Sequence, residues 1–147
     1  GPEHTFAMGS SMGGLLSYYL VKEHPDTFGA CGCVSTHFPL SPAVYNAFTG
    51  GPRETDDTPY VLTDIEAGAT MPASARLFFD YGTKGLDAAY GPTHEAVGAW
   101  LDAQGFVAEQ TYRIRPYEGA DHTEADWRAR VGDQLAWMLV PELVGDD

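Results

Sequence analysis

Residues 9–13 read Gly9-Ser10-Ser11-Met12-Gly13, a G-x-S-x-G pattern that places a serine on a tight turn between a strand and a helix. The flanking sequence supplies that context. Residues 5–8 (TFAM) are short and apolar enough for a buried strand, and residues 15–21 (LLSYYLV) form an apolar run that ends before Pro25. We therefore expect a sharp strand-to-helix turn with Ser11 at its apex. The alternative is a Ser/Gly-rich loop ahead of an ordinary helix.

The glycines of this stretch have a predicted steric role. A strand that reverses sharply into a helix leaves little room for Cβ atoms, so glycine is expected at positions 9 and 13. Gly14 is expected to let the helix pack close to the sheet. The exposed hydroxyl at the apex makes Ser11 a candidate nucleophile for acyl transfer.

A nucleophilic serine needs a base, and His122 is the candidate. It lies in a loop of small residues (118–123, EGADHT) that a predicted strand, residues 107–117, leads into. A helix should follow, with Thr123 as its N-cap and Asp126 as the capping-box partner. We expect it to end at Pro141 and to bury an apolar face made of Trp127, Val131, Leu135, Met138 and Leu139.

The base needs an acid to orient it, and Asp87 follows the predicted strand of residues 76–82 (RLFFDYG). The chain order Ser11, Asp87, His122 is that of the α/β-hydrolase fold. Asp80 is the main alternative, but it lies within the strand, whereas catalytic groups collect beyond the carboxyl ends of parallel strands. The sequence also leaves two further acids open, Asp121 and Glu118.

Motifs in this order resemble the putative-esterase family of α/β-hydrolases, which includes S-formylglutathione hydrolases, feruloyl and acetyl-xylan esterases, enterochelin esterases and mycolyltransferases. The motifs are GSSMGG (9–14), STHFP (35–39), FDYGT (79–83) with Leu86-Asp87, and GADH (119–122) with Glu124 and Trp127. The resemblance runs from about residue 5 to residue 140. It implies a mostly parallel sheet with flanking helices and a serine esterase with Ser11 as nucleophile, Asp87 as acid and His122 as base. It implies no metal and no cofactor.

Length bears on how much of that fold to expect. The chain has 147 residues, and only ten precede Ser11, whereas an α/β-hydrolase sheet of about eight strands with its helices needs well over about 200 residues. We expect residues 1–147 to form a partial catalytic domain, the C-terminal half of the fold, with the N-terminal strands missing. The sheet edge beside the strand that leads into Ser11 should then lack a pairing partner and be prone to self-association. Only one oxyanion-hole amide, that of Met12, is expected.

Composition limits the partners. The formal net charge is −13, from 21 acidic and 8 basic residues, which opposes binding to nucleic acid or to anionic membranes. No apolar stretch is long enough for a transmembrane helix.

Cys31 and Cys33 flank Gly32 in an apolar strand. We interpret both as small core residues, because a bond between neighbours so close in sequence is geometrically poor and two cysteines make no zinc site.

Further residues concern the substrate, expected to be a small-molecule or carbohydrate-linked ester. His37 should lie at the carboxyl edge of the sheet, on the same side as Ser11, where it either contacts substrate or caps its strand. We predict His37 and Trp127 as substrate-binding residues. The long segment 41–74, with a helix predicted over 60–67, is either a lid or plain surface covering. Hydrolase, acyltransferase of the same fold and non-catalytic module all remain open.

Overall fold

A computed structural model of the chain describes residues 1–139, so the predicted helix stop at Pro141 lies outside the described residues. The described part contains a parallel sheet in which strands adjacent in sequence are also adjacent in space. Its order is β1 (Phe6–Ser10), β2 (Ala30–Val34), β3 (Arg76–Gly82) and β4 (Tyr112–Tyr117). Parallel neighbours require crossover connections, and each crossover here contains a helix.

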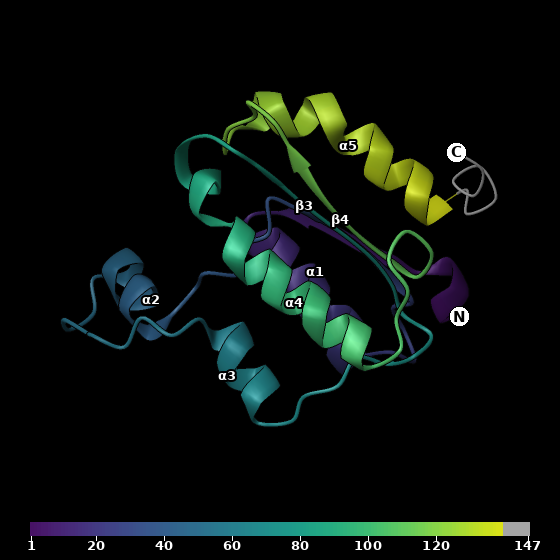
Figure 1. Cartoon of the computed structure of the whole chain (residues 1–147), viewed down its shortest axis with the longest axis horizontal. Coiled ribbons are helices and arrows are strands. Elements are labelled where there is room, and N and C mark those ends of the chain that lie inside the picture. The colour runs from purple at the N-terminus through teal and green to yellow at the C-terminus, as the bar shows by residue number, and fades with distance from the viewer. Residues whose placement is uncertain (140–147) are drawn as a thin grey trace.

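The helices form a layer on each face of the sheet. Figure 1 shows α5 on one face and α1 with α4 on the other, while α2 and α3 lie in the connection from β2 to β3. Their bounds are α1 (Met12–Glu23), α2 (Pro42–Thr49), α3 (Tyr60–Glu66), α4 (Gly91–Ala103) and α5 (Glu124–Leu139), with short 3-10 turns η1 (Pro2–His4) and η2 (Gly85–Ala89). Within residues 1–139, no helix has both the length and the apolar character needed to cross a membrane.

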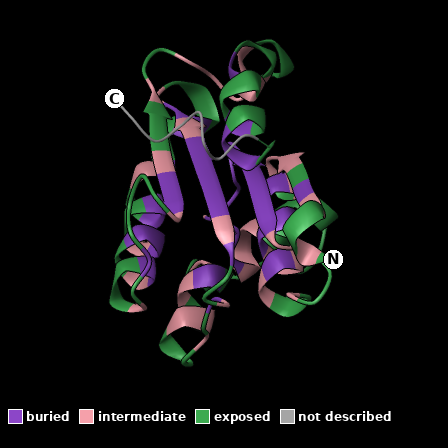
Figure 2. Ribbon diagram, turned by 90° about the vertical axis from the view of Figure 1, so that its right-hand side faces the viewer, coloured by how far each residue is buried: buried purple, intermediate pink, exposed green. Residues whose placement is uncertain are grey.

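The central strands are buried on both faces, as expected for a parallel sheet between helical layers. Figure 2 shows these strands as mainly buried and the outer surfaces of the helices as mainly exposed. Alternate residues of β2 and β3 face α1 and α4 in the larger core, which includes Cys31, Cys33, Leu77 and Phe79. The intervening residues face α5, where Phe78 packs against Trp137. The predicted mostly parallel sheet with flanking helices is therefore confirmed.

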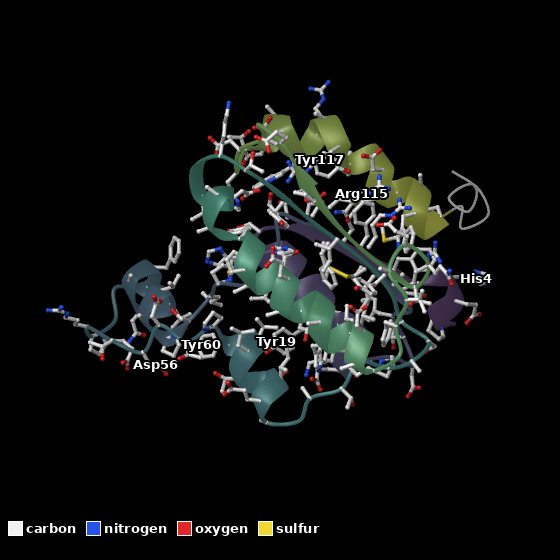
Figure 3. The ribbon with its side chains drawn as sticks, viewed as in Figure 1. His4, Tyr19, Asp56, Tyr60, Arg115 and Tyr117 are labelled. Carbon is white, nitrogen blue, oxygen red and sulfur yellow. A yellow bond between two sulfur atoms is a disulfide. The ribbon has the colours of Figure 1, made fainter. Side chains whose placement is uncertain are left out.

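The two cysteines form a disulfide, which the sequence analysis did not predict. Cys31 and Cys33 are fully buried, as expected for core residues, but a disulfide joins their sulfur atoms (Figure 3). Residues two apart in a strand point to the same face. Their Cα atoms are 5.7 Å apart, within the usual range for disulfides. The prediction of two unbonded cysteines was wrong, because residues i and i+2 of a strand can lie at a Cα–Cα distance that suits a disulfide.

The buried face of α5 also differs from the predicted one. Leu135 and Leu139 are 40% and 60% exposed, whereas Arg130 and Gln134 are buried. The reason lies on β3, where Asp80 points toward α5 and needs hydrogen-bond partners because it is fully buried. Arg130 Nη2 and Gln134 Nε2 donate to its carboxylate at 3.0 and 2.8 Å. The helix therefore turns polar side chains toward the sheet at this level.

Several element boundaries refine the sequence predictions. The strand predicted to start at residue 107 begins at Tyr112, because residues 107–111 form a turn in which Val107 N donates to Thr111 Oγ1 at 2.8 Å. The N-cap of α5 is as predicted, with Asp126 N donating to Thr123 Oγ1 at 3.3 Å. The helix predicted over 60–67 is α3.

Candidate active site

Ser11 occupies the turn between β1 and α1 in a strained backbone conformation, with φ 57° and ψ −118°. Gly9 is required there, since a Cβ would lie 2.5 Å from the Gly13 carbonyl carbon. Gly14 is required too, since a Cβ would lie 2.9 Å from Thr36 Oγ1, which confirms close packing of α1 on the sheet. At Gly13 the steric prediction was wrong, because a Cβ at that position would have no neighbour within 4 Å among the described residues. The crowding in the turn comes from residue 9.

The parallel sheet brings the other candidate residues to Ser11. Ser10 pairs with Val34, and Gly82 pairs with Tyr117, so the loops after all strands leave the sheet at its carboxyl edge. Ser11 Oγ lies 2.9 Å from His122 Nε2. On the other side of the imidazole, His122 Nδ1 lies 2.6 Å from Asp87 Oδ1. The chain thus forms a continuous hydrogen-bonded line of serine, histidine and carboxylate.

Backbone contacts hold the Asp87 loop against the His122 loop. Thr83 N and Lys84 N both donate to Ala120 O at 3.0 Å, and Gly119 N donates to Thr83 Oγ1 at 2.8 Å. The approach is so close that a Cβ on Gly82 would lie 2.2 Å from Ala120 O. Glycine at the end of β3 is therefore what allows the two loops to join, and their joining sets the distance between the carboxylate and the imidazole.

The position of Asp87 distinguishes it from the other acids. Asp87 is fully buried on η2, and its Oδ2 accepts a hydrogen bond from Gly82 N at 2.6 Å. Asp80 instead pairs with Arg130 beneath α5. Asp121 Oδ1 accepts from the His122 backbone N at 2.6 Å, and Glu118 is exposed. Of these four acids, only Asp87 is hydrogen-bonded to the imidazole.

A cavity of about 450 Å³ opens beside Ser11. Most of its wall is apolar; it is lined by Ser11, Met12, His37, Leu40, Tyr45, Phe48, Thr49, Leu86 and His122. Part of the wall comes from α2, which our sequence reasoning missed. The signal was present, because Ser41 caps the helix by accepting from Val44 N, Pro42 follows, and Gly50 ends it in the left-handed conformation.

His37 lies where the sequence predicted, at the carboxyl edge and in the cavity wall. Its backbone N donates to Ser11 O at 3.2 Å, and its Nδ1 lies 2.5 Å from the hydroxyl of Tyr90. Its Nε2 is buried and has no hydrogen-bond partner among the described residues. Burial lowers the pKa of His37, which favours the neutral form of the ring. Sequence reasoning missed Tyr90, whose phenol pKa is raised by burial and by the charge of Asp87.

Trp127 does not line this cavity, so its placement does not support the prediction that it binds substrate. Its ring instead packs edge-on against His122, with centroids 4.9 Å apart, and its Nε1 donates to Ser35 Oγ at 2.9 Å. Trp127 therefore contacts the His122 imidazole from outside the cavity. Within residues 1–139, no cluster of three or more His, Cys, Asp or Glu side chains could hold a metal ion.

Comparison with known proteins places this geometry in context. The sequence model of the family described as putative esterase matches residues 1–138. None of the curated proteins gives a significant sequence match.

Solved structures share the fold at low identity. The enterobactin esterase from Shigella flexneri, in the presence of 2,3-dihydroxy-N-benzoyl-serine, is 19% identical with a TM-score of 0.73, over 97% of this chain and 33% of that one. An S-formylglutathione hydrolase from Staphylococcus aureus is 18% identical with a TM-score of 0.62, over 93% of this chain and 51% of that one. A fluorophosphonate-binding serine hydrolase from Staphylococcus aureus is 18% identical with a TM-score of 0.60, over 99% of this chain and 56% of that one.

These likenesses establish the fold. The four strands and their helices correspond to the C-terminal half of an α/β-hydrolase fold, as predicted. The chain spans about a third of the length of the enterobactin esterase and about half of the two other structures.

Proposed function

Because this chain belongs to the putative esterase family, we propose that it is a serine carboxylic ester hydrolase, and that residues 1–147 are a partial catalytic domain. The observation that carries the proposal is the hydrogen-bonded line from Ser11 through His122 to Asp87, with Ser11 on a strained turn beside a cavity. A nucleophile within hydrogen-bond reach of a base that is oriented by a third group is the arrangement acyl transfer requires.

In the proposed reaction, Ser11 Oγ attacks the ester carbonyl while His122 Nε2 accepts the hydroxyl proton. Asp87 holds the imidazole by accepting from Nδ1 and stabilises the imidazolium that forms. The tetrahedral intermediate collapses to an acyl-enzyme, and the alcohol leaves with the proton from His122. Water then attacks the acyl group by the same route, which releases the acid and restores Ser11.

The developing oxyanion needs donors, and Met12 is proposed to supply one. Met12 begins α1, so its N–H is among the first helix amides, which have no carbonyl partner within the helix. The second donor is still expected from a loop that the family resemblance implies, the one after the third strand of a complete α/β-hydrolase sheet. In that fold this strand comes before the turn that carries the nucleophile, so it is not β3 of this chain. Loss of one donor typically costs about 10²–10³-fold in rate, so turnover should depend strongly on that loop.

The cavity wall bears on the substrate. Apolar side chains from α2 and from the neighbouring loops, including Phe48, Leu40 and Leu86, favour an ester whose acyl or alcohol part is apolar. His37 is proposed to contact the substrate through Nε2, the buried polar atom that lacks a partner in the described structure. An ester oxygen that reached this atom would satisfy it, and an unsatisfied buried polar group is costly.

Covalent labelling tests the nucleophile. A fluorophosphonate probe should modify Ser11, and the Ser11→Ala variant should lose all labelling. The matched control is Ser10→Ala, which removes the adjacent hydroxyl at the end of β1 and should label normally. Labelling that survives Ser11→Ala would exclude the proposed nucleophile.

A further inference from the structure

Ser35 connects the two buried carboxylates of the site. It directly follows β2, is fully buried and has a positive φ of 42°. Its backbone N donates to Asp80 Oδ1 at 2.9 Å, and its hydroxyl lies 2.5 Å from Asp87 Oδ2. The cavity beside Ser11 is lined by other residues. Ser35 thus contacts the carboxylate behind the imidazole from outside the space proposed for the substrate.

The hydrogen-bonding capacity of a hydroxyl fixes the direction of the bond between Ser35 and Asp87. A serine hydroxyl can donate one hydrogen bond and accept two. Trp127 Nε1 lies 2.9 Å from Ser35 Oγ and Arg130 Nη2 lies 2.6 Å from it. Both nitrogens can only donate, so they occupy the two acceptor positions of the oxygen. The single hydroxyl proton must therefore point to Asp87 Oδ2.

That bond, together with one from the backbone, fixes how Asp87 faces the imidazole. Oδ2 accepts from the Ser35 hydroxyl and from Gly82 N, which leaves Oδ1 to accept from His122 Nδ1 at 2.6 Å. A carboxylate free to rotate about its last bond would present Oδ1 to the imidazole in only part of its conformations. Hydrogen bonds to a charged acceptor are stronger than those to a neutral one, so both donors restrain that rotation effectively.

We propose that Ser35 is a positioning residue for the proposed ester hydrolysis, acting through Asp87, and that Trp127 and Arg130 hold its hydroxyl in the required direction. The inference rests on the proposed function of the Ser11 site. Arg130 is itself oriented by Asp80, to which the same Nη2 donates at 3.0 Å. Asp80, the alternative acid of the sequence analysis, is therefore linked by hydrogen bonds to the imidazole only through Arg130, Ser35 and Asp87, or through Ser35 and Asp87 by way of the Ser35 backbone N.

The first test separates positioning from folding and from substrate binding. Ser35→Ala should lower kcat for an aryl ester about tenfold and change KM less than about twofold, because the lost bond goes to a charged group outside the cavity. Ser35→Gly should show the same loss of kcat. Glycine adopts a positive φ readily, so a loss seen in this variant cannot be attributed to backbone strain at position 35. The matched control is Ser17→Ala, another buried serine, whose hydroxyl donates to Gly13 O at 2.8 Å. If both Ser35 variants keep more than half of wild-type kcat, the proposal is wrong.

A double-mutant cycle tests the role of Trp127. Trp127→Phe keeps an aromatic ring beside His122 but removes the N–H that donates to Ser35. It should lower kcat about threefold in the wild type and have no effect in Ser35→Ala, because its target hydroxyl is then absent. Equal effects in the two backgrounds would show that Trp127 does not act through Ser35.

NMR spectroscopy tests this inference independently of the proposed function. The His122 Nδ1 proton, hydrogen-bonded to Asp87, should give a strongly deshielded NMR resonance whether or not the protein turns over ester. In Ser35→Ala it should exchange with solvent at least about tenfold faster, because Asp87 is less restrained; an unchanged exchange rate would overturn the inference. Absence of fluorophosphonate labelling in the wild type would instead refute the proposed function and leave the NMR comparison to decide the role of Ser35.

Discussion

Asp87→Asn should inactivate the enzyme while leaving the fold intact. The surroundings of Asp87 force the new amide into one orientation. Its Oδ2 position faces two donors, Gly82 N at 2.6 Å and Ser35 Oγ at 2.5 Å, so the amide oxygen must take that place. The amide N–H₂ then faces His122 Nδ1, which must accept instead of donate. The proton of the neutral imidazole moves to Nε2, where it blocks proton transfer from Ser11.

The size of the effect follows from the cost of the opposite orientation. Turning the amide to restore the working tautomer would place N–H₂ against both donors and leave these buried groups unsatisfied, at about 1–3 kcal/mol each. A cost of roughly 4 kcal/mol keeps the working tautomer at about one part in 10³, since each 1.36 kcal/mol is a factor of ten. We therefore expect kcat to fall about 10³-fold, before counting the lost charge that stabilises the imidazolium.

Hydrolysis rates of a short aryl ester and melting curves, measured in parallel on Asp87→Asn and Asp80→Asn, give the comparison. Asp80→Asn should act mainly on stability, because Asp80 balances the buried Arg130 and does not contact His122. An Asp87→Asn enzyme within tenfold of wild type would refute the tautomer argument. A folded but inactive Asp80→Asn beside an active Asp87→Asn would reverse the assignment of the acid.

Three further predictions concern other parts of the chain. His122→Ala should lower aryl-ester hydrolysis by about 10³-fold or more, and a variant that keeps a tenth of the activity would place the base elsewhere. Burial lowers the pKa of His94 from 6.5 to about 4, so between these pH values the unfolded chain binds a proton that the folded protein does not. Stability should fall as the pH drops through this range, by about 2 kcal/mol from pH 7 to pH 5 in denaturant titrations, and His94→Gln should abolish this part of the pH dependence. Among the described residues no strand pairs with the outer edge of β1. Met8 on β1 is 36% exposed, and Leu16 on α1, the helix packed against β1, is 60% exposed. A protein of residues 1–147 should therefore self-associate in sedimentation experiments, less so as Met8→Lys/Leu16→Lys, and a monodisperse monomer would contradict this.

Local patterns were enough to predict the elements around the site. Ser11, two residues after Gly9 and between an apolar strand and an apolar helix, specifies a strand–turn–helix, because glycine at position 9 leaves room for so sharp a reversal. Thr123 and Asp126 specified the start of α5 through the cap that they form. The sequence showed that Asp87 follows β3 and that His122 follows the next strand. The general rule that loops at the carboxyl ends of parallel strands meet then predicted that both lie near Ser11.

Only the tertiary structure decided what contacts these elements make. Sequence periodicity put Leu135 and Leu139 in the core, yet Arg130 and Gln134 turn inward instead, because the buried carboxylate of Asp80 on β3 accepts their hydrogen bonds. Sequence reasoning assigned Trp127 to substrate binding, yet its ring lies against His122 and outside the cavity wall, because its position depends on how α5 lies across the sheet. The direction of the Ser35 hydroxyl depends on four side chains from three parts of the chain: Ser35 itself, Asp87 on η2, and Trp127 and Arg130 on α5. Local sequence determines conformation over a few residues, whereas the pairing of buried polar groups is settled only when distant elements pack and each group must find a partner.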